Sequence, residues 1–171
     1  MKLNVGCSWP KGRYKQDDWI NLDLVGNKRV NVRGNALALP FDVNSIEKVH
    51  CAHLLEHLRR DKYPEVLREM HRVVKPGGNV YVEVPDLRGT IELLRQSFDV
   101  GDIIGIQRWT TSIYGKNEIE GMEHHWGFYE GLLRRDLRVC GFKDVVRLTK
   151  KEDMISEHYC QEPILLVRGT K

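Results

Sequence analysis

The sequence predicts an α/β fold, in which a doubly wound and mostly parallel sheet carries helices on both faces. Short segments with alternating apolar side chains recur along the chain, and segments with helical periodicity separate them. Glycine or proline marks most of the boundaries. An alternation of strands and helices is typical of α/β proteins with a parallel sheet.

The first half of the chain supplies the first strands. In residues 19–25, Ile20, Leu22 and Leu24 alternate with polar residues, as in a half-buried strand. Three further strands are expected at residues 3–5, 29–36 and 46–55, and the second half of the last one is ambiguous. A helix is expected to begin after Asp61, which can cap it, and to end at "KPGG", residues 75–78.

The middle of the chain continues with a strand at residues 79–84, whose valines share one face, and with a helix at residues 90–98. Residues 99–123 have no clean period, so we expect a long insertion of about 99–125 that forms a lid or the acceptor side of a site.

The end of the chain begins with an amphipathic helix from Tyr129 to Cys140, which Gly141 closes. Strands are expected at residues 142–148 and 163–169. Because no helix separates them, they should pair antiparallel at an edge of the sheet.

Length and composition indicate a single globular domain, residues 1–171. The chain is 41% hydrophobic and 30% charged, and its net charge of +3 gives no indication of a nucleic-acid or membrane partner. It has no expected signal peptide and no apolar run long enough to span a bilayer. The four cysteines are far apart, which indicates reduced thiols in a cytoplasmic protein: Cys7, Cys51, Cys140 and Cys160.

Two positions at the ends of the first strands point to a ligand. The first strand runs into Gly6, Cys7 and Ser8, and the second carries Asp23. In an open α/β sheet, ligands bind at the carboxyl ends of the strands, where a carboxylate can accept hydrogen bonds from a ribose diol. Asp23 comes only 17 residues after Gly6, which leaves little room for a full crossover helix.

Seven segments resemble, in order and spacing, the class I S-adenosylmethionine-dependent methyltransferases. They are "LNVGC", "NLDL", "GNALALPF", "HLLEHL", "EMHRVVKPGG", "VYVEVPDL" and "CGF". The resemblance covers residues 2–87 well and residues 123–142 moderately. It implies a seven-stranded Rossmann-like sheet of order 3-2-1-4-5-7-6 with an antiparallel edge strand. The short spacing between Gly6 and Asp23 adds the expectation that the first helix is reduced or missing.

The resemblance also implies a set of residues that bind S-adenosyl-L-methionine, whose product is S-adenosyl-L-homocysteine. The glycine loop would run beneath the methionine part, and Asp23 would hold the ribose hydroxyls. The next loop would meet the adenine, and the segment after the fourth strand would lie beneath the sulfonium and adenosine. The implied set is Val5, Gly6, Cys7, Ser8, Asp23, Asn35, Ala36, Leu37, His53 and Leu54.

Two positions depart from the family pattern. The chain has "GCS" where the family usually has "GCG", and a carboxylate and a ribose demand fewer glycines than a pyrophosphate does. Asn35 stands where the family usually has an aspartate, and its carbonyl can still accept a hydrogen bond from the adenine amino group.

Residues 53–57 read "HLLEH", which is also the inverted zinc-peptidase pattern. On a helix His53 and His57 would share one face and could bind Zn²⁺, with Glu56 activating water. The third ligand would be Glu123 or Glu130. A strand that delivers His53 to a loop would break this geometry, and in that case Glu56 and His57 cap and pack the following helix.

The distal segment supplies the acceptor-side residues. His124 and His125 precede Trp126, and a histidine can accept a proton from a hydroxyl or an amine near neutral pH. In the resembling family a histidine before such a turn lies on the acceptor side. Arg108, Tyr114 and Trp126 are expected to bind the acceptor.

These features predict a methyltransferase that acts on an oxygen or a nitrogen of a small-molecule or glycan acceptor, without a metal ion. Two other interpretations stay open. Ser8 and the short first crossover fit a non-catalytic Rossmann-like scaffold, and the "HLLEH" segment fits a zinc peptidase.

Overall fold

The structure is a computed structural model that describes residues 1–7, 18–28, 30–149 and 163–171. These residues form one seven-stranded sheet of order β3-β2-β1-β4-β5-β7-β6. The strands are β1 (Lys2–Val5), β2 (Ile20–Asp23), β3 (Val32–Arg33), β4 (Ile46–Ala52), β5 (Val74–Pro85), β6 (Lys143–Arg147) and β7 (Ile164–Thr170). The predicted fold class and strand order are therefore confirmed.

The sheet is parallel from β3 to β5, and β7 is antiparallel to both of its neighbours, β5 and β6. The antiparallel pairing of the last two strands is as expected, but the antiparallel strand itself is second from the edge. Residues 8–17, where the reduced first helix was expected, lie outside the described residues, as does Cys160.

Three strands, β2, β3 and β4, are shorter than their sequence patterns. The alternation in β2 ends at Asp23, because Leu24 is 62% exposed beyond the strand. Only Val32 and Arg33 of the expected third strand pair with β2. Strand β4 ends at Ala52, and the ambiguous residues after it form a loop and the short 3₁₀ helix η1 (Leu55–His57).

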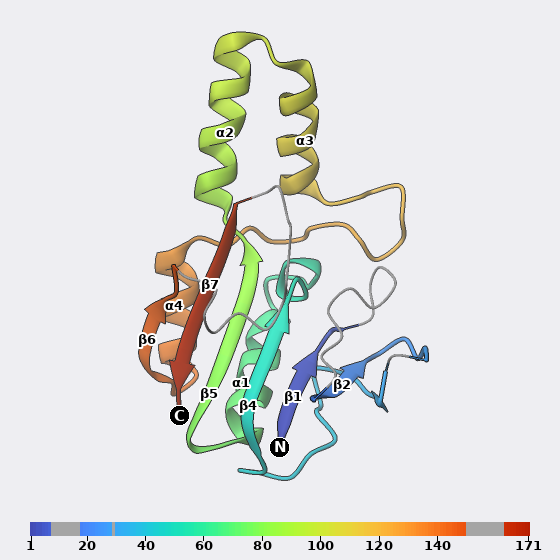
Figure 1. Ribbon diagram of the computed structural model, residues 1–171, viewed down its shortest axis with the longest axis vertical. Helices are drawn as coiled ribbons and strands as arrows, with labels where there is room; N and C mark the ends of the chain where they lie inside the picture. The colour runs from blue at the N-terminus through green and yellow to red at the C-terminus, as the bar shows by residue number, and fades with distance from the viewer. Residues whose placement is uncertain (8–17, 29, 150–162) are drawn as a thin grey trace.

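Two helices, α1 (Tyr63–Val73) and α4 (Glu130–Val139), contact each other and pack against the strands from β5 to β6 (Figure 1). The buried side of α1 follows helical spacing, with Tyr63, Val66, Leu67, Met70 and Val73. These residues and the apolar residues of β1, β4, β5 and β7 form the core. Among the described residues this packing accounts for one of the two expected helical layers.

The predicted insertion contains a helix that its sequence pattern did not reveal. Helices α2 (Leu87–Val100) and α3 (Ile103–Tyr114) form a hairpin above the carboxyl ends of the strands (Figure 1). Residues 103–114 are therefore helical, which corrects the expectation for that part of the insertion, whereas residues 115–123 form neither a helix nor a strand. The helices approach closely at Gly105, where a Cβ atom would collide with the side chains of Ser97 and Asp102.

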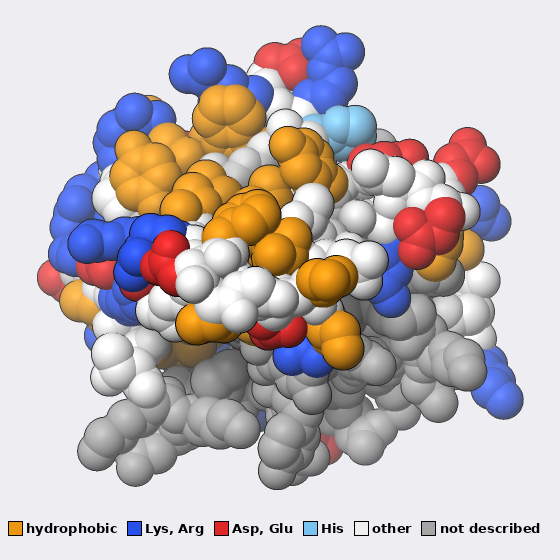
Figure 2. All heavy atoms as spheres, turned by 90° about the horizontal axis from the view of Figure 1, so that it is seen from above, with side chains coloured by type: hydrophobic (Ala, Val, Ile, Leu, Met, Phe, Trp, Pro, Cys, Tyr) orange, Lys and Arg blue, Asp and Glu red, His pale blue; other side chains and the backbone are white. Residues whose placement is uncertain are grey.

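The hairpin lies outside the main core, whose described members include no side chain of α2 or α3. Its free end is apolar and exposed at Phe98, Val100, Ile103 and Ile104. Figure 2 looks down on this end of the molecule and shows hydrophobic side chains gathered there. No helix of the described part of the chain is long and apolar enough to cross a bilayer.

Candidate functional site at the carboxyl edge of the sheet

The loop after β1 turns sharply at Gly6, which has a φ of 77°. The Gly6 N–H donates to the carbonyl of Leu22 at 2.9 Å, so the loop is held against the end of β2. A Cβ atom at Gly6 would lie 3.1 Å from the Leu54 side chain. A glycine is required here by both the backbone conformation and the close approach of Leu54.

The neighbours of Gly6 complete the first loop. Val5 is fully buried in the core, and Cys7 is buried beside it. Burial raises the pKa of the Cys7 thiol to about 12, and the Asp23 charge adds to this, so Cys7 stays protonated at neutral pH. Ser8 lies outside the described residues.

Asp23 is the last residue of β2 and is half-buried at the carboxyl edge. Its Oδ1 accepts a hydrogen bond of 2.9 Å from the Val25 N–H, and its backbone carbonyl accepts one from the Gly34 N–H. The first bond fixes the carboxylate at the strand end, and the second ties β2 to the loop that contains Asn35.

The loop of residues 34–41 is organised by Asn35. The Asn35 Oδ1 accepts a hydrogen bond of 2.9 Å from the Leu37 N–H, so this oxygen stabilises the turn that contains Ala36. Ala36 and Leu37 are half-buried against the core.

An ion pair on α1 holds the end of this loop. The Arg72 guanidinium donates to the carbonyls of Leu39 and Phe41 at 2.9 and 2.8 Å and to both carboxylate oxygens of Glu69. Glu69 in turn accepts a bond of 2.8 Å from the Leu39 N–H. The hydrogen bond from Arg72 lowers the pKa of Glu69. The sequence analysis did not assign a role to this pair.

His53 lies on the loop after β4 with a φ of 48°, which is uncommon outside glycine. Its Nδ1 is 3.1 Å from Glu56 Oε1, and its Nε2 is 3.5 Å from Glu83 Oε1. Leu54, the next residue, contacts the Gly6 loop as described above. This segment therefore lies between the Gly6 loop, which Leu54 contacts, and the buried carboxylates of Glu56 and Glu83, which His53 contacts.

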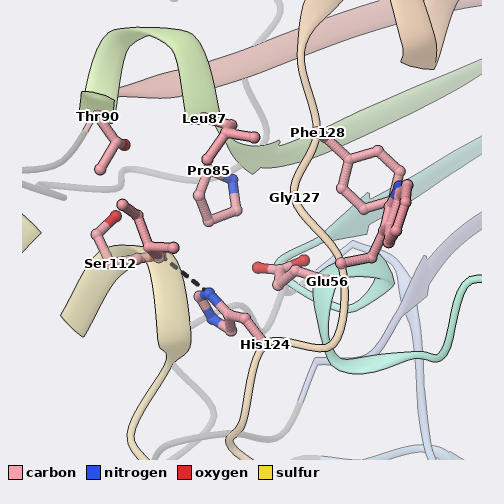
Figure 3. A pocket seen from close by; sticks show the side chains of 10 residues that line it. Glu56, Pro85, Leu87, Thr90, Ser112, His124, Gly127 and Phe128 are labelled. Carbon is pink, nitrogen blue, oxygen red and sulfur yellow. Dashed lines mark hydrogen bonds between the residues drawn. The ribbon is translucent and has the colours of Figure 1, made fainter. Parts of the chain in front are cut away.

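A small pocket lies beside this segment, between the loop after β4 and the base of the α2–α3 hairpin (Figure 3). Its polar side chains are Glu56, Thr90, Ser112 and His124, and its walls include Leu87, Ile113, Trp126 and Phe128. The His124 Nδ1 is hydrogen-bonded to the carbonyl of Ser112 at 3.0 Å. The pocket therefore combines apolar walls with groups that bind or exchange protons.

Glu56 is the buried acid of this pocket. Burial raises its pKa, but the hydrogen bond from His53 and the charges of His53 and His57 lower it more, so that the net shift is downward. Glu56 is therefore ionised at neutral pH, although it is only 1% exposed. The sequence analysis considered Glu56 only for a peptidase or a structural role, and Thr90 and Ser112 were missed.

The two distal histidines lie in different surroundings. His124 faces the pocket, whereas the side chain of His125 is exposed. The backbone N–H of His125 donates to the Glu56 carbonyl at 2.8 Å. Trp126 lines the pocket and stacks beneath Arg60, 4.8 Å away. Arg108 and Tyr114 are exposed on α3 and do not line it.

The geometry of an inverted zinc peptidase is absent from the "HLLEH" segment. His53 is in a loop and only Leu55–His57 is helical, as a single 3₁₀ turn, so His53 and His57 do not share a face of an α-helix. Of the nominated third ligands, Glu130 pairs with Arg134 and Arg147, and Glu123 meets His57 through its backbone carbonyl. The structure instead brings Glu56 and His57 close to His124.

Residues 15–82 match a family model described as a methyltransferase domain. The demethylmenaquinone methyltransferase of Oceanobacillus iheyensis is 45% identical over 76 residues, which is 44% of this chain and 31% of that protein. The enzyme of that name from Geobacillus stearothermophilus is 39% identical over 79 residues, or 40% of this chain and 33% of that protein. The matches thus span about a third of the length of these curated relatives.

Solved structures match almost the whole chain. A SAM-dependent methyltransferase from Archaeoglobus fulgidus has a TM-score of 0.67 at 15% identity, and the match covers 99% of this chain and 85% of that one. A possible histamine N-methyltransferase from Thermotoga maritima has a TM-score of 0.61 at 17% identity, with 99% and 81% covered.

A third neighbour was solved with ligands. It is the 1,6-didemethyltoxoflavin-N1-methyltransferase of Burkholderia thailandensis, with bound 1,6-didemethyltoxoflavin and S-adenosylhomocysteine. Its TM-score is 0.59 at 15% identity, and the match covers 99% of this chain and 70% of that one. At these identities the likeness to all three establishes the fold.

Proposed function

We propose that the chain is a class I S-adenosylmethionine-dependent methyltransferase and that it transfers a methyl group from S-adenosylmethionine to an acceptor oxygen or nitrogen. The observation that carries the proposal is the convergence of Gly6, Asp23 and Leu54 at the carboxyl edge of the sheet, beside a pocket that contains Glu56 and His124. Ligands of open α/β sheets bind at this edge. The bound cofactor supplies an electrophilic methyl group and leaves as S-adenosylhomocysteine.

The cofactor side of the site fits this ligand. Gly6 lets the chain turn sharply at the end of β1 and pack against Leu54, and Cys7 and Ser8, the next residues in the sequence, would hold the methionine part. The half-buried carboxylate of Asp23 suits the two ribose hydroxyls, which are hydrogen-bond donors. Asn35, Ala36 and Leu37 would surround the adenine, in a loop that Arg72 holds in place.

The acceptor side is the pocket of Figure 3. Because the His124 Nδ1 is bonded to a carbonyl, it carries the proton in the neutral ring, and Nε2 is then the atom that accepts a proton from the acceptor. Trp126 would support the acceptor, while Arg108, Tyr114 and His125 would contact its exposed parts. The α2–α3 hairpin supplies Leu87, Thr90, Ser112 and Ile113 to the pocket, which supports its role as the acceptor-side insertion.

The proposed acceptor is a small molecule or a glycan with a hydroxyl or an amine. The pocket has a volume of about 10 Å³, which is room for one water-sized group, so it would take only the reacting hydroxyl or amine of the acceptor beside Glu56 and His124. Most of the rate enhancement would come from holding the acceptor in line with the methyl group, as expected for a displacement that needs no covalent intermediate. The relatives are named demethylmenaquinone methyltransferases, so demethylmenaquinone is one acceptor to test. Since they match less than half of this chain, other acceptors are tested beside it.

A thermal-shift experiment followed by a transfer assay tests the proposal. At 100 times its dissociation constant, a ligand that binds only the folded state stabilises it by about 2.7 kcal/mol. For a chain of this length that raises the melting temperature by about 5–11 °C. We expect this shift with S-adenosylmethionine and S-adenosylhomocysteine and not with adenosine triphosphate. The absence of any shift with both would support the scaffold interpretation.

Transfer itself is measured with methyl-labelled S-adenosylmethionine and fractions of small molecules from a cell extract. A labelled product that depends on His124 supports the proposed acceptor side. A protein that binds the cofactor tightly and labels no fraction, demethylmenaquinone included, would contradict the activity but not the cofactor site.

A further inference from the structure

Three side chains around the pocket form a cluster of metal-ligating groups. One ligand atom from each of Glu56, His57 and His124 lies within 4.8 Å of the others. The rings of His57 and His124 meet edge to face, with centroids 4.9 Å apart. We propose that these three residues bind one divalent transition-metal ion of the zinc type at the acceptor side of the site.

Both histidines are oriented as metal ligands usually are. The His57 Nδ1 is 3.0 Å from the carbonyl of Glu123, and the His124 Nδ1 is 3.0 Å from the carbonyl of Ser112. A carbonyl only accepts hydrogen bonds, so each Nδ1 is the protonated nitrogen, and the lone pair of the neutral ring is on Nε2. An imidazole that donates one N–H to a backbone carbonyl and coordinates through its other nitrogen is the common arrangement at metal sites.

The Glu56 carboxylate has one oxygen engaged and one unsatisfied. Oε1 is 3.1 Å from the His53 Nδ1, whereas Oε2 is buried and has no hydrogen-bond partner. The side chain is 2% exposed, so water does not compensate this oxygen. A buried carboxylate oxygen without a partner is costly, and a cation is the natural group to satisfy it. In Figure 3 the Glu56 carboxylate lies next to the His124 ring at the pocket.

The donor set indicates the kind of ion. Two imidazole nitrogens and one carboxylate oxygen suit Zn²⁺, and three protein ligands leave a fourth position open, as in catalytic zinc sites. In a tetrahedral site with bonds of 2.0–2.1 Å the ligand atoms lie about 3.3 Å apart. Side-chain rotations that move these atoms by about an ångström would therefore close the cluster on the ion.

The role of the ion rests on the proposed function. Its open position would face the pocket, where it would take a hydroxyl oxygen of the acceptor and lower the pKa of that hydroxyl, whose proton then passes to water. In the metal-bound form the His124 Nε2 is a ligand, so the ion replaces this nitrogen as the group that activates the hydroxyl. This site differs from the "HLLEH" peptidase pattern, because His124 replaces His53 as a ligand. His53 instead holds the second oxygen of Glu56, which makes it a positioning residue.

The site is tested by metal binding alone, without cofactor or acceptor. The whole chain is treated with a chelator, dialysed, and titrated with Zn²⁺ by calorimetry and with Co²⁺ by absorption. We expect one equivalent of each ion, with visible Co²⁺ bands of a four-coordinate site and no thiolate charge-transfer band. Binding with a thiolate band, at more than one equivalent, or not at all would overturn the proposal.

Variants assign the ion to the cluster. Changes to outer residues of metal sites weaken binding by about 10–100-fold, so His57→Ala, His124→Ala and Glu56→Gln should each weaken it by more than about 100-fold. His125→Ala is the matched control, because His125 is adjacent but exposed and outside the cluster, and it should bind like the wild type. Equal loss in His125→Ala, or unchanged binding in His57→Ala, would also overturn the site.

Two further measurements separate loss of a metal ligand from misfolding, and failure of the metal site from failure of the proposed function. Circular dichroism checks that each variant is folded, and Glu56→Gln retains the size of the side chain if an alanine variant does not fold. Binding of S-adenosylhomocysteine is measured on the metal-free protein. Metal binding without cofactor binding would refute the proposed function and leave the metal site, and the reverse would refute only the metal site.

Discussion

Replacing Arg72 by methionine tests whether the Arg72–Glu69 pair holds the loop that is proposed to bind adenine. The change keeps most of the side-chain length and removes the guanidinium. Four hydrogen bonds are lost, two to Glu69 and two to the carbonyls of Leu39 and Phe41. Glu69 is left without its counter-ion, and the loop is left with its bond from the Leu39 N–H.

The magnitude follows from the number of bonds and their exposure. A hydrogen bond to a charged group contributes about 1.5–3 kcal/mol when it is well shielded. The Arg72 side chain is 34% exposed, and water compensates part of each lost bond. We therefore expect a loss of about 2–3 kcal/mol for the whole pair, which for a chain of this size lowers the melting temperature by about 4–12 °C.

The assay is thermal and urea denaturation followed by circular dichroism, with calorimetry of S-adenosylhomocysteine on the folded variant. Arg95→Met is the matched control, because Arg95 pairs with Glu92 and Asp99 on the surface of α2 and is 60% exposed. Exposed pairs of that kind contribute little to stability, because water and salt screen them. If Arg72→Met is no less stable than Arg95→Met, or binds the cofactor product like the wild type, the pair does not hold the loop.

Three other outcomes are expected. The hydrogen bond from Arg72 lowers the pKa of Glu69 from its usual value of about 4.5, so the stability from this pair is present above that pH and is lost as the pH falls through the lowered pKa. The difference in unfolding free energy between the wild type and Arg72→Met, measured by urea denaturation, should therefore decrease in acid. A difference that stays constant with pH would contradict this. Gly6→Ala should lower the stability of the fold by about 1–2 kcal/mol and weaken cofactor binding, because φ is 77° and the Leu54 side chain must move. Gly121→Ala is the control: its φ is 79° with open space around it, so it should lose a similar amount of stability and bind the cofactor like the wild type. Replacing His124 and His125 by alanine should leave calorimetric cofactor affinity nearly unchanged and slow methyl transfer by about 10²–10⁴-fold, with His124→Ala alone giving most of the effect; a wild-type rate would make both histidines structural.

The sheet was predictable because its signals are local. Alternating apolar residues, the helical spacing from Tyr63 to Val73 and the "KPGG" segment each specify their element within a few residues. Helix α3 was missed for a physical reason. Its buried residues are Gly105, Trp109 and Ser112, while Ile103 and Ile104 are exposed, so hydrophobicity does not mark the face that packs on α2.

The cofactor side of the site was predictable from local patterns, and the acceptor side was not. Gly6 and Asp23 were identified because each ends a strand whose pattern is clear, and parallel strands bring their carboxyl ends together. The meeting of His57 with His124 depends on the return of the chain from α3 to the loop after β4, where His125 and Trp126 bond to the Glu56 carbonyl. No local pattern encodes that contact, so the acid and the histidines were recognised separately and not as one group.

Isothermal titration of the wild type and Asp23→Ala with S-adenosylhomocysteine tests the central claim most directly, because Asp23 sits at the strand end where the ribose is proposed to bind. The account predicts one site per chain in the wild type and an affinity loss of about 1.5–3 kcal/mol in the variant, the range for a charge-assisted hydrogen bond. Glu47→Ala, an exposed carboxylate on the same sheet next to the first residue of β4, should bind like the wild type. No binding by the wild type, or equal affinities for all three proteins, would contradict the claim that this edge of the sheet holds the cofactor.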